Sequence, residues 1–295
     1  MCFLIRAGTH GTVWKGGFLS CGGRPDLNNG SSVSKECFHI PIGGNTGSQV
    51  QYPDMLVPRT DLASAIYQGR LWLIGGRIGS QGNIFTMFEI VSQFCEKSGY
   101  YFFNIFLLGP FLDSTEIIGS DNQWTFGPTL PGSLYFHAAC PTLSEDSNTR
   151  YLICGGTFNG LQTNKAYLYD WSTDAWSNLP DMLENAIYHS CSPFKVNDGA
   201  SDIVVVNLGT VSKKVQFLDL SSLTWSSGPD LPVRRFINQQ LTVVGRLFLI
   251  GGHDGTNGLT DTLELSTDGL TWSPSDPGMT LTVANDFFLA IPYNI

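Results

Sequence analysis

The sequence predicts an all-β repeat protein built from short units of four strands. The first observation is a tryptophan followed by a proline-containing turn, which recurs at intervals of about 50 residues, a spacing typical of repeat architectures. Its four copies begin at Trp124, Trp176, Trp225 and Trp272. The second is a recurring apolar run that ends in glycine. The third is the frequency of turn formers, with 33 glycines and 15 prolines in 295 residues. Because 42% of the residues are hydrophobic, the chain has enough apolar material for a large core.

The apolar runs predict one strand of each unit, because uninterrupted runs of this length indicate strands buried on both faces. They end in Gly-Gly at 18–23, 71–76, 151–156 and 247–252, with degenerate copies at 105–109 and 203–209. Terminal glycines allow close backbone approach or positive φ. Other strand-like segments lie before the tryptophan at 113–118, 165–170, 215–220 and 261–265, and after the turn at 134–139, 186–191 and 236–241. With the tryptophan strand, each unit has four strands in a fixed order.

These motifs resemble the kelch repeat, in which a glycine pair, a tyrosine-bearing strand, a tryptophan, a proline turn, and an arginine and histidine three residues apart follow one another. The resemblance covers residues 18–294. It implies a single domain, residues 1–295, folded as a kelch-type β-propeller of six four-stranded antiparallel blades. The blades are expected at 18–56 together with 283–293, 58–92, 93–131, 132–183, 184–232 and 233–277.

Two features of the ring follow from this alignment. Gly76 and Gly109 lie too close together in the sequence for the usual set of strands, so we expect the second blade to be shortened. The tail at 284–293 matches the pattern at 184–194, which predicts that a C-terminal strand closes the ring beside the N-terminal strands. Residues 1–13 are then left over, either as an extra strand or as a competitor for the same place. The repeated tryptophans are expected to pack between neighbouring blades.

No catalytic residue is predicted. The arginine and histidine of the repeat never occur together here, and His137 and His189 keep only the second position, where we interpret them as structural. The chain lacks a Gly-x-Ser-x-Gly elbow and a phosphate-binding loop, and no cysteine pair has metal-ligand spacing. We therefore expect a protein that is not an enzyme and holds no metal or cofactor. The alternative is a kelch-fold enzyme acting on carbohydrate, such as a sugar mutarotase or an oxidase-like protein.

Composition limits the classes of partner and the cellular compartment that we expect for this protein. The net charge is −9 with no basic stripe, which argues against nucleic acid. The most apolar stretch, 100–112, is shorter than the roughly 20 residues that cross a bilayer, so we expect a protein without a membrane partner. The seven cysteines are read as buried free thiols of a reducing compartment rather than as a disulfide framework, which favours a cytoplasmic location. We expect a monomer, and the chain is also compatible with a fragment of a longer adaptor.

The resemblance implies that protein or peptide partners bind at loops on one rim of the propeller. Two arginines, Arg24 and Arg77, directly follow a glycine pair, and Arg59 and Arg235 lie in the other class of loop. Guanidinium groups there suit an acidic peptide, although scattered solvated arginines are an equal alternative. Other residues expected on this rim are Phe158, Asn159, His253 and Asp254. The hypothesis predicts that replacing Arg24 and Arg77 by alanine weakens binding without lowering the melting temperature.

Overall fold

The computed structural model describes residues 10–15, 17–23, 33–41, 50–67, 70–78, 111–142, 150–170, 172–197, 201–210 and 212–275. These residues form β-strands, turns and connections, with no helix among them. Accordingly, no helix that meets the length and hydropathy needed to cross a bilayer occurs in this part of the chain.

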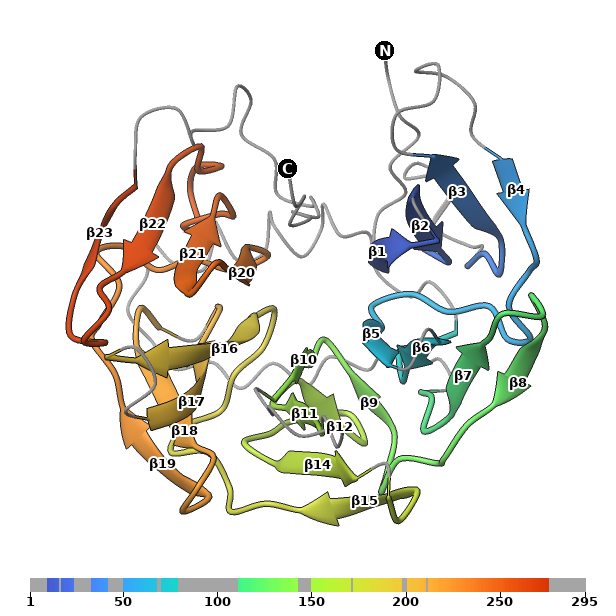
Figure 1. Cartoon of the computed structure of the whole chain (residues 1–295), viewed down its shortest axis with the longest axis horizontal. Coiled ribbons are helices and arrows are strands. Elements are labelled where there is room, and N and C mark those ends of the chain that lie inside the picture. The colour runs from blue at the N-terminus through green and yellow to red at the C-terminus, as the bar shows by residue number, and fades with distance from the viewer. Residues whose placement is uncertain are drawn as a thin grey trace.

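The strands build five four-stranded antiparallel sheets, here called blades 1 to 5, which follow one another in an arc around a common centre (Figure 1). The strands of blades 1 and 2 are β1 (His10–Trp14), β2 (Gly17–Cys21), β3 (Cys37–Pro41) and β4 (Val50–Tyr52), then β5 (Ala63–Tyr67), β6 (Arg70–Ile74), β7 (Thr115–Ile118) and β8 (Trp124–Phe126). The strands of blade 3 are β10 (Ala138–Pro141), β11 (Tyr151–Cys154), β14 (Ala166–Asp170) and β15 (Ala175–Asn178). The strands of blades 4 and 5 are β16 (Cys191–Val196), β17 (Ser201–Asn207), β18 (Val215–Asp219) and β19 (Thr224–Ser227), then β20 (Gln239–Val243), β21 (Arg246–Ile250), β22 (Thr262–Leu265) and β23 (Trp272–Pro274). In every blade the first strand is innermost (Figure 1).

The innermost strand of blade 1 differs from the prediction. β1 pairs with β2 from His10 opposite Cys21 to Trp14 opposite Gly17. It therefore occupies the innermost position of blade 1, where residues 283–293 were expected. The two strands are joined by a tight turn at Lys15, which takes the left-handed conformation with φ of 45°. A local hairpin therefore fills this place, which is one of the two alternatives for the N-terminal residues. Residues 276–295 lie outside the described part of the chain, so closure of the ring by the tail stays a prediction.

The division between the second and third predicted blades, 58–92 and 93–131, is also corrected. β7 pairs with β6, from Ile118 opposite Leu71 to Thr115 opposite Ile74, and β8 pairs with β7. One complete blade therefore combines strands on both sides of residues 79–110, which lie outside the described residues. The described chain holds five four-stranded sheets, and the count of six stays a prediction.

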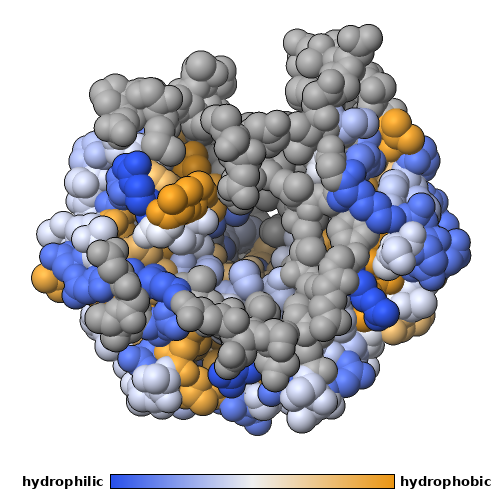
Figure 2. Space-filling model, in the orientation of Figure 1, coloured by the Kyte–Doolittle hydropathy of each residue, from blue (hydrophilic) through white to orange (hydrophobic). Residues whose placement is uncertain are grey.

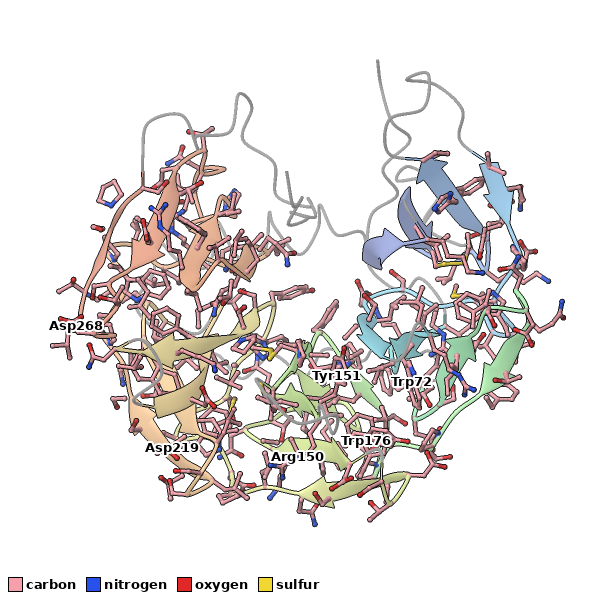
Figure 3. All side chains as sticks on the ribbon, in the orientation of Figure 1. Trp72, Arg150, Tyr151, Trp176, Asp219 and Asp268 are labelled. Carbon is pink, nitrogen blue, oxygen red and sulfur yellow. A yellow bond between two sulfur atoms is a disulfide. The ribbon has the colours of Figure 1, made fainter. Side chains whose placement is uncertain are left out.

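Clusters of apolar side chains between successive blades form the core. Four such clusters join blades 1 and 2, 2 and 3, 3 and 4, and 4 and 5. Each contains one repeated tryptophan: Trp124, Trp176, Trp225 and Trp272 in turn along the chain. Figure 3 shows Trp72, Tyr151 and Trp176 gathered in this way between blades 2 and 3. The prediction that the tryptophans pack between blades is confirmed.

The glycine pairs bring successive blades into backbone contact. Gly76, at φ of 95°, donates its N–H to the carbonyl oxygen of Leu134 in the connection to the next blade, at 2.8 Å. A Cβ atom on Gly75 would lie 2.4 Å from the same oxygen. Close approach and positive φ are thus both required at this position, as the sequence predicts.

The cysteines correct a further prediction. Cys21 and Cys37 lie opposite each other on β2 and β3 and form a disulfide, and Cys140 of β10 forms a second with Cys191 of β16. Cys154 is buried and free. The reading of the cysteines as free thiols is wrong for these four residues. The pairs are 16 and 51 residues apart, so strand register and blade contact, rather than sequence spacing, decide them.

Candidate partner-binding face

Two classes of loop meet at one end of every blade that has both described. They are the connection that enters a blade and the connection that follows its glycine pair, and together they are called the loop face. A short sheet in blade 3 shows the pattern, where β9 (Leu134–Tyr135) pairs with β12 (Thr157–Phe158), which pairs with β13 (Leu161–Gln162). The equivalent bridges in blades 2, 4 and 5 are Thr60 to Arg77, Ile187 to Gly209, and Phe236 to His253. The expectation that both loop classes share one rim is supported.

One backbone position on the loop face is left-handed in four successive blades. It directly follows the bridge and leads into the innermost strand, and its members are Asp61, Phe136, Tyr188 and Ile237, with φ between 53° and 57°. This conformation is unfavourable for residues other than glycine, especially β-branched and bulky ones. Its repetition in four blades shows that it belongs to the fold. Two hydrogen bonds join these positions between neighbouring blades, from the N–H of Phe136 to the carbonyl oxygen of Asp61 at 3.2 Å and from the N–H of Ile237 to that of Tyr188 at 2.9 Å. Strain of this kind concentrates at binding sites, so the ring of left-handed residues marks the loop face as a candidate site.

Four aromatic side chains run across the loop face from blade 2 to blade 4. The rings of Phe111 and Tyr135 are stacked with centroids 4.7 Å apart, Tyr135 contacts Phe136 at 4.9 Å, and Phe136 contacts Tyr188 at 4.1 Å. These four residues are called the aromatic ladder. Tyr135 and Phe136 are buried, and the two end members are half-buried. Burial raises the pKa of Tyr135 above its ordinary value, which keeps the phenol neutral.

Arg77 supports this ladder and is not a free binding residue. Its Nε donates to Asp61 at 2.6 Å, and both side chains are 6% exposed. The guanidinium carbon lies 5.1 Å from the ring centre of Phe136 and 5.8 Å from that of Tyr135. The predicted role of Arg77 at the partner is therefore corrected, because its charge is paired and its plane is covered by aromatic rings.

Arg59 and Arg235 are likewise corrected, because both side chains are fully buried. Arg59 donates to the carbonyl oxygen of Gly75 at 2.8 Å and to the carboxylate of Glu116 at 2.6 Å. Arg235 makes the equivalent bonds to Gly251 at 3.2 Å and to Asp261 at 2.5 Å. Burial lowers the pKa of Arg59, while Glu116 opposes this. Both arginines tie the glycine-ended strand to the connection that enters the blade.

The remaining predicted rim residues lie on the loop face with mostly structural contacts. Phe158 is half-buried and stacks on Tyr167 at 6.3 Å. Asn159 is exposed, and its side-chain oxygen accepts the N–H of Ser133 at 3.2 Å. The half-buried pair that follows Gly252 also orders its own loop. His253 Nδ1 accepts the N–H of Gly255 at 2.8 Å, and Asp254 accepts those of Thr256 and Asn257 at 2.7 Å each. Arg24 lies outside the described residues.

A residue that the sequence analysis missed, Arg234, has the properties expected of a binding arginine. It is half-buried, and its guanidinium lies 5.8 Å from the ring centre of Phe236. Its Nε and Nη2 donate to the carbonyl oxygen of Asp254 at 3.2 and 2.9 Å, and its Nη1 donates to that of Thr210 at 3.4 Å. None of the ion pairs among the described residues includes it. The sequence held a usable signal. Arg235 occupies the same repeat position as the buried Arg59, so its neighbour Arg234 is the arginine that remains on the loop face.

The histidines of the repeat are buried, as expected of structural residues. His189 Nε2 lies 3.8 Å from the sulfur of Cys154, and burial lowers the pKa of His189 to about 4, so its ring is neutral near pH 7. Across the ranges described, no group of three or more His, Cys, Asp and Glu side chains is placed to share a metal ion.

Comparisons with known proteins give independent information on the fold. No family model matches the chain. It is 29% identical over 114 residues, 37% of its length, to an F-box/kelch-repeat protein of Arabidopsis thaliana, and the match spans 30% of that protein. Its structure is similar to one described as "Structure of YjhT", with a TM-score of 0.67 over 92% of this chain and 84% of the other, at 15% identity. The second comparison concerns the fold alone. Together with the sheets they support a kelch-type propeller fold.

Proposed function

We propose that the protein is a non-catalytic binding module whose loop face holds an acidic segment of a partner protein. One observation carries the proposal: the guanidinium of Arg234 is fixed on the loop face by two backbone carbonyl oxygens, and no carboxylate of the described residues binds it. The resemblance to the kelch repeat and the match to an F-box/kelch-repeat protein support a role in protein interaction.

The hydrogen bonds of Arg234 leave it suited to a carboxylate. A guanidinium has five N–H donors, and three of them are engaged in the bonds to Asp254 and Thr210. Among the described residues no further acceptor is bonded to Nη1 or Nη2, which leaves one N–H on each terminal nitrogen for the oxygens of a carboxylate or phosphate. Because the guanidinium is already held in place, little side-chain entropy is lost when a partner binds.

The rest of the loop face gives this arginine a rigid surrounding. The N–H of Thr210 donates to Ile187 at 3.1 Å, and that of Ile237 donates to Tyr188 at 2.9 Å, so the blade 4 and blade 5 loops are joined next to the aromatic ladder. Hydrophobic and hydrophilic residues are interspersed on the described surface in Figure 2, rather than gathered in one apolar patch. We therefore propose Arg234 as the charged anchor of this region, next to the hydrogen bonds that join the loops of blades 4 and 5.

Selection of random dodecapeptides displayed on phage tests this proposal. Peptides enriched on the wild-type protein should contain Asp or Glu, and Arg234→Ala should weaken their binding by about tenfold or more, as for a charge-assisted bidentate contact. Arg70→Ala is the matched control, because Arg70 is exposed at the opposite end of its strand. Equal loss in both variants, or enriched peptides without acidic residues, would contradict the role of Arg234.

The non-catalytic assignment has its own test. Purified protein is expected not to speed the interconversion of sugar anomers, followed by polarimetry, and measured turnover would favour the carbohydrate-enzyme alternative. The monomeric state stays a prediction. The cytoplasmic location stays a prediction too, and the two disulfides weigh against it, because such bonds are typical of oxidising compartments.

A further inference from the structure

We propose that the Cys140–Cys191 disulfide is a reversible clasp that controls the loop face. Reduction would loosen blades 3 and 4 from each other and so weaken partner binding. The binding part of this inference rests on the function proposed above, whereas the loosening of the blades does not.

The position of this disulfide sets it apart from the other one. Cys140 and Cys191 lie on the innermost strands of different blades, with Cα atoms 5.9 Å apart, and these strands share no hydrogen-bond ladder. Cys21 and Cys37 face each other on two strands that are already paired along their length. Breaking Cys21–Cys37 leaves the ladder between β2 and β3 intact. Breaking Cys140–Cys191 removes the covalent link across the interface between blades 3 and 4.

The clasp lies next to contacts that shape the loop face. Phe136 and Tyr188 enter the same two strands, four and three residues before the cysteines, and their rings meet at 4.1 Å across the interface. Close by, the N–H of Gly156 donates to the carbonyl oxygen of Ala186 at 2.6 Å. Both contacts depend on the distance between the blades. We therefore expect reduction to disturb the contact between Phe136 and Tyr188 at the blade 4 end of the aromatic ladder.

The chemistry requires a dithiol reductant of the Cys-x-x-Cys class. One of its thiolates attacks Cys191 Sγ, and the Cys140 sulfur leaves as a thiolate and takes up a proton. The second thiol of the reductant then resolves the mixed disulfide, so the reductant ends as a disulfide and the clasp as two thiols, a transfer of two electrons. Because both cysteines are buried, attack requires the blade interface to open first. A bound partner that holds the interface closed should consequently slow reduction.

Hydrogen–deuterium exchange measured by mass spectrometry tests the clasp without any partner. In wild-type protein reduced with dithiothreitol, and in the double variant Cys140→Ala with Cys191→Ala, amide exchange at 134–140 and 186–191 should rise by about tenfold or more, as expected for local opening. The double variant Cys21→Ala with Cys37→Ala should leave these segments unchanged. Unchanged exchange at both segments in the reduced wild type, with alkylation proving that Cys140 and Cys191 are free, overturns the proposal.

A second measurement connects the clasp to binding. An acidic dodecapeptide selected on the oxidised protein should bind the reduced protein at least several-fold more weakly, and should slow the reduction of Cys140–Cys191 by dithiothreitol. If exchange rises while affinity stays equal, control of binding is refuted and the proposed function stands. If no peptide is selected, the proposed function fails, and the exchange experiment still decides whether the blades loosen.

Discussion

Arg59 and Glu116 form an ion pair with an Nη2–Oε1 distance of 2.6 Å, and neither side chain is exposed. The carboxylate of Glu116 also accepts the N–H groups of Leu56 and Val57 at 2.6 and 3.0 Å. A single buried acid therefore fixes the connection that leaves blade 1 to the third strand of blade 2. In blade 4 the amide oxygen of Gln216 accepts the N–H of Leu183 at 2.8 Å, so the same strand position fixes an entering connection there.

The variant Glu116→Ala should lower the free energy of unfolding by about 3–5 kcal/mol, because it leaves the guanidinium of Arg59 buried without a counter-charge. Urea denaturation followed by tryptophan fluorescence measures the loss. Glu264→Gln is the matched control, since its pair with Arg246 is partly exposed and should contribute less than about 1 kcal/mol. Similar losses in both variants would mean that the buried pair has no special role.

The cost of a buried charge without its partner also corrects the expectation for Arg77→Ala. The sequence hypothesis predicts that replacing Arg24 and Arg77 together leaves the melting temperature nearly unchanged. Arg77→Ala, however, leaves Asp61 buried without its partner and removes the cation next to the aromatic ladder. We expect a loss of about 3–5 kcal/mol in the free energy of unfolding. Thermal unfolding of Arg77→Ala beside Arg234→Ala checks this, because the latter removes a half-buried arginine that forms no ion pair with a described residue. A melting temperature lowered equally by the two variants would contradict it.

The repeat pattern predicted the glycines and tryptophans correctly because their roles are backbone and packing roles that recur in each blade. The pattern could not predict the roles of the arginines. A shared repeat position indicates that a side chain has the same role in each copy, but it does not show whether that role is structural or partner-binding. The disulfide between Cys140 and Cys191 was unpredictable for another reason. Its partners meet only through the contact of two blades, and no spacing within one repeat encodes that contact.

Trp124 gives a direct measure of packing between blades. Its ring is buried between blades 1 and 2, and its Nε1 donates to the carbonyl oxygen of Pro53 at 2.8 Å. Trp124→Ala should cost about 3–5 kcal/mol of unfolding free energy, and Trp124→Phe, which keeps most of the ring, about 1 kcal/mol for the lost hydrogen bond. Phe126 on the same strand is 61% exposed, so Phe126→Ala should change the stability by less than about 0.5 kcal/mol. A large loss in Phe126→Ala would show that the outer strand is also packed.

His189 should make the protein sensitive to acid. Its folded-state pKa is lowered to about 4, below the ordinary value of 6.5, because burial disfavours the imidazolium. The unfolded chain therefore binds more protons between these values, so this contribution to stability is complete above pH 6.5 and is lost as the pH falls toward 4. The loss should reach about 3 kcal/mol. His189→Asn, which introduces the residue found at the equivalent Asn238, should flatten this part of the profile in urea titrations at several pH values, and an unchanged slope would contradict the assignment.

The two disulfides should differ in their effect on global stability as well as on local opening. In the loop-closure description a disulfide stabilises by restricting the unfolded chain, and the effect grows with the length of the loop. Cys140–Cys191 closes 51 residues and Cys21–Cys37 closes 16. Replacement of each pair by alanine should therefore cost about 4 and about 3 kcal/mol of unfolding free energy. Urea denaturation of the two double variants beside oxidised wild type gives both values, with Cys154→Ala as the control for loss of a buried sulfur that closes no loop. If Cys154→Ala costs as much as the Cys140 and Cys191 double variant, the packing of the sulfur atoms, rather than the covalent link between the blades, is what stabilises this interface.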